Sequence, residues 1–281
     1  MPYYPIIMDK ENDLRLSGLS RREFLKGLVG IIPYPLLKPP EPPPTTQPPS
    51  KEQKEVSFTS SVLYYHEVTR GRLTSDIIDL IKRGFQPLSL DTFIKTLNGD
   101  VNISPDPTFL VTCDDSLLSQ YTEGLPAIEA IKKETGIFVP LTFFSIMRFE
   151  DLGYKTIDEM PNDTPAFNDG THQYMTKAHL IDILRQGHYV QNHTVYHTNL
   201  TRLTNEELKN EVRYGESRAD ELWEAAGLNR KGKAFAYPYG AFHRREQDYL
   251  ASFGYDVAFS TMPTTNQYSS QRYRLGRLRR T

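Results

Sequence analysis

Two adjacent carboxylates and a pair of histidines are the residues of this chain whose types and spacing suggest chemistry. Asp114 and Asp115 end an apolar run, and His193 and His197 occur further along with three residues between them. One Asp and two His can hold a divalent ion while the second Asp remains free to act as a base. Three protein ligands leave a coordination position for water or substrate, which is typical of catalytic metal sites. These residues predict a metal-dependent hydrolase.

The spacing of His193 and His197 is a modest signal by itself, because such pairs occur by chance. On a helical turn the two imidazoles would share one face, as a single ion requires, and we expect such a turn here. The neighbouring His188 is expected to be structural. Surface or capping roles are expected for the remaining unpaired histidines, which are His172, His179 and His243.

Short apolar runs alternate with amphipathic stretches from residue 58 onward. The predicted strands are 61–65, 108–113, 138–144, 188–192, 234–237 and 256–260. The predicted helices are 74–83, 90–97, 124–134, 176–186, a long one from the capping box at 204–207 to about 226, and 244–253. Strands that alternate with helices imply βα units and hence an α/β fold with a parallel sheet or barrel.

Polar side chains follow four of the predicted strands. They are His66, the pair Asp114 and Asp115, His193 and Tyr239. In parallel βα folds the carboxyl ends of the strands face the active site, so these groups are expected to meet at one mouth.

His66 follows two tyrosines and precedes Glu67, whose carboxylate could orient the imidazole. A histidine near neutral pH is suited to protonating a leaving amine, so His66 is a candidate general acid. A hydrogen-bonded core histidine is the alternative, and the residues alone leave both open.

The composition describes an ordinary globular protein with one sizeable domain or two small ones. The chain has 281 residues, of which 38% are hydrophobic and 24% charged, and a formal net charge of −2. This balance gives no electrostatic argument for a nucleic-acid partner. Cys113 is the only cysteine, which excludes an intrachain disulfide and a Cys-based zinc site. We expect it to be a buried, inert thiol.

The N-terminal region carries an address signal and a spacer. The segment 20–26, with Arg21 and Arg22, resembles a twin-arginine export signal, and the apolar stretch 27–37 is too short to span a bilayer. Residues 1–37 are therefore predicted to direct export to the periplasm, cell surface or medium. A basic tail of an intracellular protein is the alternative.

A proline-rich linker is predicted over 38–55, and a catalytic domain over 56–281. Such a spacer would hold the domain away from a membrane or cell wall. Association with either through the N-terminus is therefore expected, whereas the oligomeric state stays open.

Three motifs in order resemble the polysaccharide deacetylases, the NodB-homology or carbohydrate esterase family 4 domains. They are TCDD at 112–115, HTVYH at 193–197 and FAYPYG at 235–240, and the resemblance spans roughly 58–278. The resemblance implies a distorted (β/α) barrel of the NodB-homology type. It also implies removal of N-acetyl groups from N-acetylglucosamine polymers.

The resemblance assigns roles to individual residues. It implies that Asp114 is the general base and that Asp115, His193 and His197 bind one divalent ion, most often zinc. It implies that the backbone N–H of Tyr239 contributes to an oxyanion hole.

Three departures from the family pattern stand out. Ser116 replaces a common Gly, Ala236 replaces an Arg that orients the base in many members, and no histidine follows His243. Either an arginine from 272–280 orients the base, or the base is less well oriented.

The segment VLYYH at 62–66 resembles the exopolysaccharide and poly-N-acetylglucosamine deacetylase branch, in which the chain order is permuted. In that branch the acid histidine comes early, which implies that His66 replaces the missing late one.

Rival interpretations keep part of this assignment. The substrate could be a non-sugar amide or an O-acetyl ester, or the domain could be a weakly active, glycan-binding module at the cell surface. The arginines of 272–280 could bind an anionic polymer, although a solvated tail is the expected state of this segment.

Overall fold

The computed structural model describes residues 7–8, 14–15, 55–103, 107–148 and 156–280. The chain divides into two compact units, 1–51 and 52–281. Within the first unit, β1 (Ile7–Met8) and β2 (Leu14–Arg15) pair antiparallel. Arg21 and Arg22 of the predicted export signal lie outside the described residues, as does the predicted linker apart from its last residue, Glu55.

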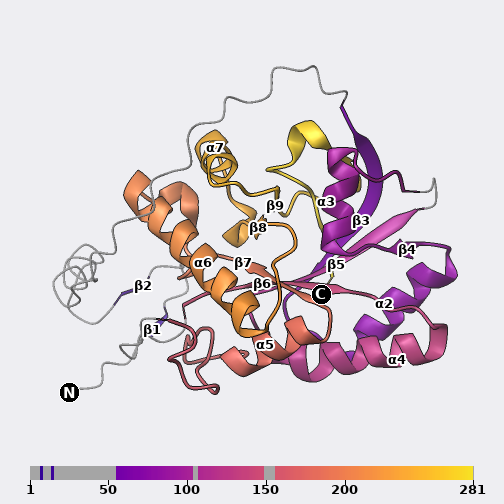
Figure 1. The fold of residues 1–281 in the computed structure, drawn as a ribbon, viewed down its shortest axis with the longest axis horizontal. Helices are drawn as coiled ribbons and strands as arrows, with labels where there is room; N and C mark the ends of the chain where they lie inside the picture. The colour runs from indigo at the N-terminus through magenta and orange to yellow at the C-terminus, as the bar shows by residue number, and fades with distance from the viewer. Residues whose placement is uncertain (1–6, 9–13, 16–54, 104–106, 149–155, 281) are drawn as a thin grey trace. The chain divides into compact units, whose positions relative to one another are not determined.

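A curled, mostly parallel sheet forms the centre of the second unit (Figure 1). Its path runs β10-β3-β5-β6-β7-β8-β9, and β4 pairs with β5. The strands are β3 (Ser57–Tyr65), β4 (Gln86–Pro87), β5 (Thr108–Asp114), β6 (Leu141–Ser145), β7 (Tyr189–Asn192), β8 (Ala234–Ala236), β9 (Val257–Phe259), β10 (Asn266–Tyr268) and β11 (Leu278–Arg279). Every pairing from β3 to β9 along this path is parallel.

The last described segment joins the two ends of the parallel part of the sheet, β3 and β9. Leu275 forms a parallel bridge with Phe259 of β9, and Leu278 of β11 pairs in parallel with Leu63 of β3. The C-terminal segment therefore connects β9 with β3, the two ends of the parallel part of the path, and the curled sheet forms a distorted (β/α) barrel. This confirms the predicted fold class, and it places the beginning and end of the catalytic unit side by side.

Helices cover the outside of the curled sheet (Figure 1). They are α2 (Arg70–Lys82), α3 (Leu90–Asn98), α4 (Leu125–Thr135) after the π-helix η1 (Gln120–Gly124), α5 (Lys177–Arg185), α6 (Asn205–Ala225) and α7 (Arg244–Ser252). The predicted capping box opens α6, since the Thr204 hydroxyl accepts from the Glu207 N–H and the Glu207 carboxylate accepts from the Thr204 N–H. No helix in the described part of the chain has the length and apolar character needed to cross a bilayer.

The central strands are buried on both faces, which explains their continuous apolar sequence. All seven residues of β5 are buried, including Cys113, whose thiol pKa is raised by burial. A buried thiol that resists ionisation is inert, as expected from the sequence. The predicted strand at 138–144 is shorter and ends one residue later, at Ser145.

His188 lies buried between α5 and β7. Its Nδ1 accepts a hydrogen bond of 3.0 Å from the Leu141 N–H, and its ring packs against Phe138 and Phe143. Burial lowers the pKa of His188 to about 4. This ring is a packing element, in agreement with the structural role expected for it.

His188 should make the free energy of unfolding depend on pH. Its pKa is lower in the folded state than the ordinary value of 6.5, so the unfolded chain binds the proton more readily. Stability should be full above about pH 6.5 and fall by about 1.4 kcal/mol per unit as the pH drops toward 4. His188→Asn, whose amide oxygen can still accept from Leu141, should flatten this slope in urea denaturation.

His243→Asn is the matched control, because that side chain is largely exposed at the start of α7. Equal slopes for the wild type and His188→Asn would contradict the assignment.

Candidate active site

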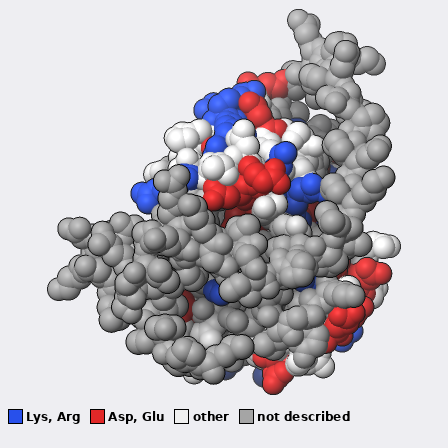
Figure 2. All heavy atoms as spheres, turned by 90° about the vertical axis from the view of Figure 1, so that its left-hand side faces the viewer, with Lys and Arg blue, Asp and Glu red and all other residues white. Residues whose placement is uncertain are grey.

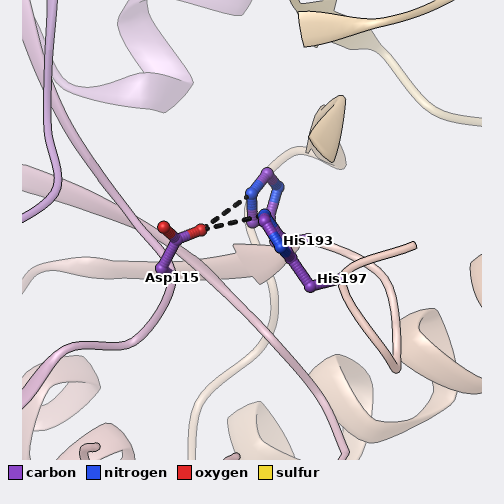
Figure 3. A group of neighbouring side chains, drawn as sticks. All are labelled: Asp115, His193 and His197. Atoms are coloured by element: carbon purple, nitrogen blue, oxygen red, sulfur yellow. Dashed lines mark ion pairs between the residues drawn. The ribbon is translucent and has the colours of Figure 1, made fainter. Parts of the chain in front are cut away.

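Asp115, His193 and His197 meet at the carboxyl ends of β5 and β7 (Figure 3). Asp115 Oδ1 lies 3.2 Å from the Nε2 atoms of both His193 and His197. One ligand atom from each residue lies within 4.8 Å of the other two. The structure thus brings together the three residues that the family resemblance implies as one ligand set.

The two histidines do not share a helical turn, and that expectation was wrong. Residues 193–199 form a loop in which Thr194 and His197 have φ of +69° and +51°. These left-handed conformations turn the chain so that His197 returns toward His193. Backbone bonds hold the start of this loop against β6, since His193 donates to Ser145 O and Met147 donates to Thr194 O.

The donor set fits a divalent cation. His193 Nδ1 donates to the Ala236 carbonyl oxygen over 2.7 Å, which fixes the tautomer and turns Nε2 toward Asp115. Asp115 Oδ1 is buried and has no hydrogen-bond donor among the described residues. Two imidazole nitrogens and a carboxylate oxygen suit zinc and similar ions.

The electrostatics favour a cation at the same point. Burial alone would raise the pKa of Asp115, but the two imidazoles outweigh it and hold that pKa well below its usual range. Burial alone would lower the pKa of His193, but Asp115 and Asp114 raise it. The carboxylates of Asp114 and Asp115 therefore favour a positive charge at this site.

Asp114 lies beside this group but has a different partner. Arg277 Nη1 and Nη2 donate to its Oδ1 and Oδ2, each over 2.7 Å. Arg277 is only 1% exposed, and its guanidinium carbon lies 4.6 Å from the centre of the Tyr64 ring. It also donates to Thr112 Oγ1 and to Ser260 O. This planar bidentate contact fixes the orientation of the carboxylate.

Position 236, where many family members have an arginine that orients the base, is Ala236, a small buried residue of β8. In this chain Arg277 contacts Asp114 instead. Of the two alternatives left by the sequence, the structure contains the first, an arginine from 272–280 on Asp114. The expectation of a solvated tail there was wrong, because Leu278–Arg279 form β11 and Arg277 is buried.

His66 follows β3 and reaches the same mouth. Its Nε2 lies 3.7 Å from Asp115 Oδ2, its side chain is 37% exposed, and its ring packs edge-on against Tyr64. A core histidine would be buried, so that alternative does not hold. Glu67 does not orient the ring as the sequence suggested, since its carboxylate accepts from Ser119 Oγ.

Tyr239 completes the rim after β8. It has φ of +60° within the turn η3 (Pro238–Gly240), its side chain is 68% exposed, and its ring centre lies 4.8 Å from that of His197. The described residues offer no acceptor to its backbone N–H. Gly240 also has a positive φ. A larger residue would not fit here, because its Cβ would lie 2.1 Å from Thr261 Oγ1.

Ser116 adopts φ of +61°, a conformation that suits the glycine common at this position in the family. Its buried hydroxyl accepts from the Ile146 N–H over 3.0 Å. This bond offsets part of the conformational cost of a side chain at this position.

The sequence did not predict that the segment 172–175, which precedes α5, lies at the edge of the site. Leu118 donates to Gln173 O and Met175 donates to Ser116 O, so this segment runs directly beside Asp115. It carries His172, whose Nδ1 lies 2.7 Å from Asp169 Oδ2. No spacing in the sequence links these residues to the motifs, because the pairing is made by backbone atoms.

The polysaccharide deacetylase family model matches residues 102–258. This range includes Asp114, His193 and Tyr239 but neither His66 nor Arg277. A search of curated proteins finds no match.

Several solved structures share the fold of this chain. The Streptococcus pyogenes deacetylase PplD, solved in complex with acetate, has a TM-score of 0.61 and 16% identity over 80% of this chain and 93% of PplD. IcaB from Ammonifex degensii has a TM-score of 0.59 and 20% identity over 79% and 92% of the two chains. The BpsB deacetylase domain from Bordetella bronchiseptica has a TM-score of 0.57 and 17% identity over 80% and 96%.

Removal of the Arg277 side-chain charge should destabilise the protein strongly. In Arg277→Met the Asp114 carboxylate would be buried without its cation, which costs about 3–5 kcal/mol in comparable pairs. Adding Asp114→Asn to Arg277→Met should restore part of the loss, because the amide needs no cation. Urea denaturation of the single and double variants measures both effects.

Arg279→Met, an exposed neighbour in β11, is the control and should change stability little. Losses of equal size at 277 and 279 would exclude a special role for the buried pair.

Proposed function

Because this chain belongs to the polysaccharide deacetylase family, we propose that it removes N-acetyl groups from an N-acetylglucosamine-containing polysaccharide with the help of a divalent ion. The family predicted from the motifs is confirmed by the matched range. The observation that carries the finer proposal is the meeting of Asp115, His193 and His197 beside an arginine-braced Asp114. The fold shared with IcaB and BpsB supports the exopolysaccharide deacetylase branch.

Asp115, His193 and His197 would hold the ion, for which we propose zinc. When bound, such an ion acts as a Lewis acid that polarises a carbonyl and makes water more acidic. PplD, a similar structure, was solved with acetate, the acid that deacetylation releases. A reaction that releases acetate is thus compatible with this fold.

The protein residues supply the proton transfers. Asp114 is proposed as the base that takes a proton from the attacking water, with each of its oxygens accepting one Arg277 N–H. The Tyr239 N–H is proposed to stabilise the oxyanion, a contribution of about 3 kcal/mol for one donor. His66, whose Nε2 lies 3.7 Å from Asp115 Oδ2, is proposed to protonate the departing amine.

In this proposal the enzyme acts outside the cytoplasm, where its polysaccharide substrate would lie. Export would depend on the twin-arginine-like segment, and the linker would allow association with a membrane or cell wall. Nucleic acid is not a proposed partner. The net charge is −2, and in Figure 2 acidic and basic side chains of the described residues lie next to one another.

Acetate release from N-acetylglucosamine oligomers should require both the ion and Asp114. Dialysis against a chelator should abolish release, and added zinc should restore it. Asp114→Asn should lower turnover by at least a hundredfold while zinc still binds, because Asp114 is outside the ligand set. Release from simple acetyl esters but not from the oligomers would instead indicate an esterase, and no release with zinc bound would indicate a binding module.

His66→Gln should affect substrates according to their leaving group. An amine needs a proton to depart, whereas an aryloxide leaves without one. Turnover of N-acetyl oligomers should fall by about 10²–10⁴-fold, the usual contribution of general acid catalysis, while hydrolysis of an aryl acetate changes little. Parallel losses on both substrates would argue against an acid role for His66.

A further inference from the structure

Glu211 is a carboxylate of helix α6 that reaches the loop between the two proposed metal-ligating histidines. Its Oε2 accepts from the backbone N–H groups of Val195 and Tyr196, over 2.9 and 3.0 Å. Its Oε1 accepts from the Thr198 hydroxyl over 3.4 Å. These partners lie between His193 and His197 or directly after them.

The carboxylate is buried without a cation. Glu211 is 8% exposed, and no Lys or Arg in the described part of the chain forms an ion pair with it. Burial of a charge without a counter-ion costs several kcal/mol unless hydrogen bonds compensate. Hydrogen bonds from the loop of residues 193–199 offset part of this cost, although burial still raises the pKa of Glu211. The partners that the buried carboxylate does have therefore belong to that loop.

The loop has a conformation that needs such support. Thr194 and His197 hold positive φ, which costs of order 1 kcal/mol or more at a non-glycine residue and persists only when neighbours enforce it. Two consecutive N–H groups that point at one oxygen define the path of the chain midway between the ligands. A shift of this segment would move His197 away from Asp115.

Close approach of α6 to β7 allows Glu211 to reach the loop. Gly215, one turn further along the helix, lies so near Asn192 that a Cβ there would be 2.2 Å from Asn192 Oδ1. That same oxygen accepts from the Thr194 N–H over 2.8 Å. Helix α6 therefore packs on Asn192 of β7, which holds the start of the loop, and contacts the middle of the loop directly through Glu211.

We propose that Glu211 is a positioning residue that sets the affinity for the metal ion by holding His193 and His197 in ligand geometry. This inference rests on the metal site of the proposed function. Partners in the outer shell of metal sites typically change affinity by about 10–100-fold when removed. Glu211 acts in this way through backbone atoms rather than through the imidazole rings.

Helix α6 offers a matched control for a purely structural role. Glu216 is also buried, but its carboxylate lies 2.9 Å from Arg230 and 3.0 Å from Lys233, neither of which belongs to the loop. Loss of Glu216 should reduce stability without changing metal affinity. The exposed Glu224 controls for the loss of one negative charge on the same helix.

The experiment titrates zinc into the metal-free full chain by calorimetry, for the wild type, Glu211→Gln, Glu211→Ala, Glu216→Gln and Glu224→Gln. Thermal denaturation of each metal-free protein measures the cost to the fold. We expect zinc Kd to rise by about 10–100-fold in Glu211→Ala. In Glu211→Gln it should rise less, since the amide oxygen can still accept from the loop. Both control variants should bind zinc like the wild type, whatever their melting temperature.

Zinc binding by Glu211→Ala within twofold of the wild type would overturn the inference and leave the proposed function intact. An equal loss of affinity in Glu216→Gln would also overturn it, because general destabilisation would then explain both. Failure of the wild type itself to bind zinc would instead refute the metal-dependent function on which the inference rests. Should Glu211→Ala fail to fold, Glu211→Gln compared with Glu216→Gln decides the matter.

Discussion

The buried contact between Arg277 and Asp114 is the interaction on which the rest of the site depends. The buried guanidinium donates to both carboxylate oxygens and to the carbonyl oxygen of Ser260, directly after β9, and the Tyr64 ring lies against its face. Its own segment bridges β9 and pairs with β3. One side chain therefore joins barrel closure to the orientation of the proposed base, so that neither is set independently.

Adjacent carboxylates acquire different tasks because the chain turns between them. Asp114 is the last residue of β5 and points to Arg277, whereas Asp115 has φ of +77° and points to the two imidazoles. The first charge is neutralised by a fixed guanidinium, and the second remains available for a mobile cation. Two like charges at neighbouring positions thereby have different partners, which suits the separate roles proposed for them as base and metal ligand.

Patterns within the sequence predicted the main strands and helices, and the family resemblance implied the proposed ligand set, but neither predicted β4, β10 and β11 or the contacts that hold the site. Periodicity, the capping box before α6 and the strand-end positions of the polar residues are local signals, and they agree with the structure. The helical turn for His193 and His197 was wrong, because spacing alone does not reveal positive φ. Arg277 was confined to a segment but not identified, since its contact with Asp114 spans 163 positions. The contacts of Glu211 depend on how α6 docks, which no local pattern encodes.

The order of these parts along the chain has a consequence for biosynthesis. A ribosome makes both aspartates and both histidines well before it makes Arg277, so the emerging polypeptide holds a carboxylate whose cation does not yet exist. The strand that β11 joins is also among the first to be completed. Barrel closure must therefore wait for late translation, and Asp114 gains its buried cation only when that segment docks.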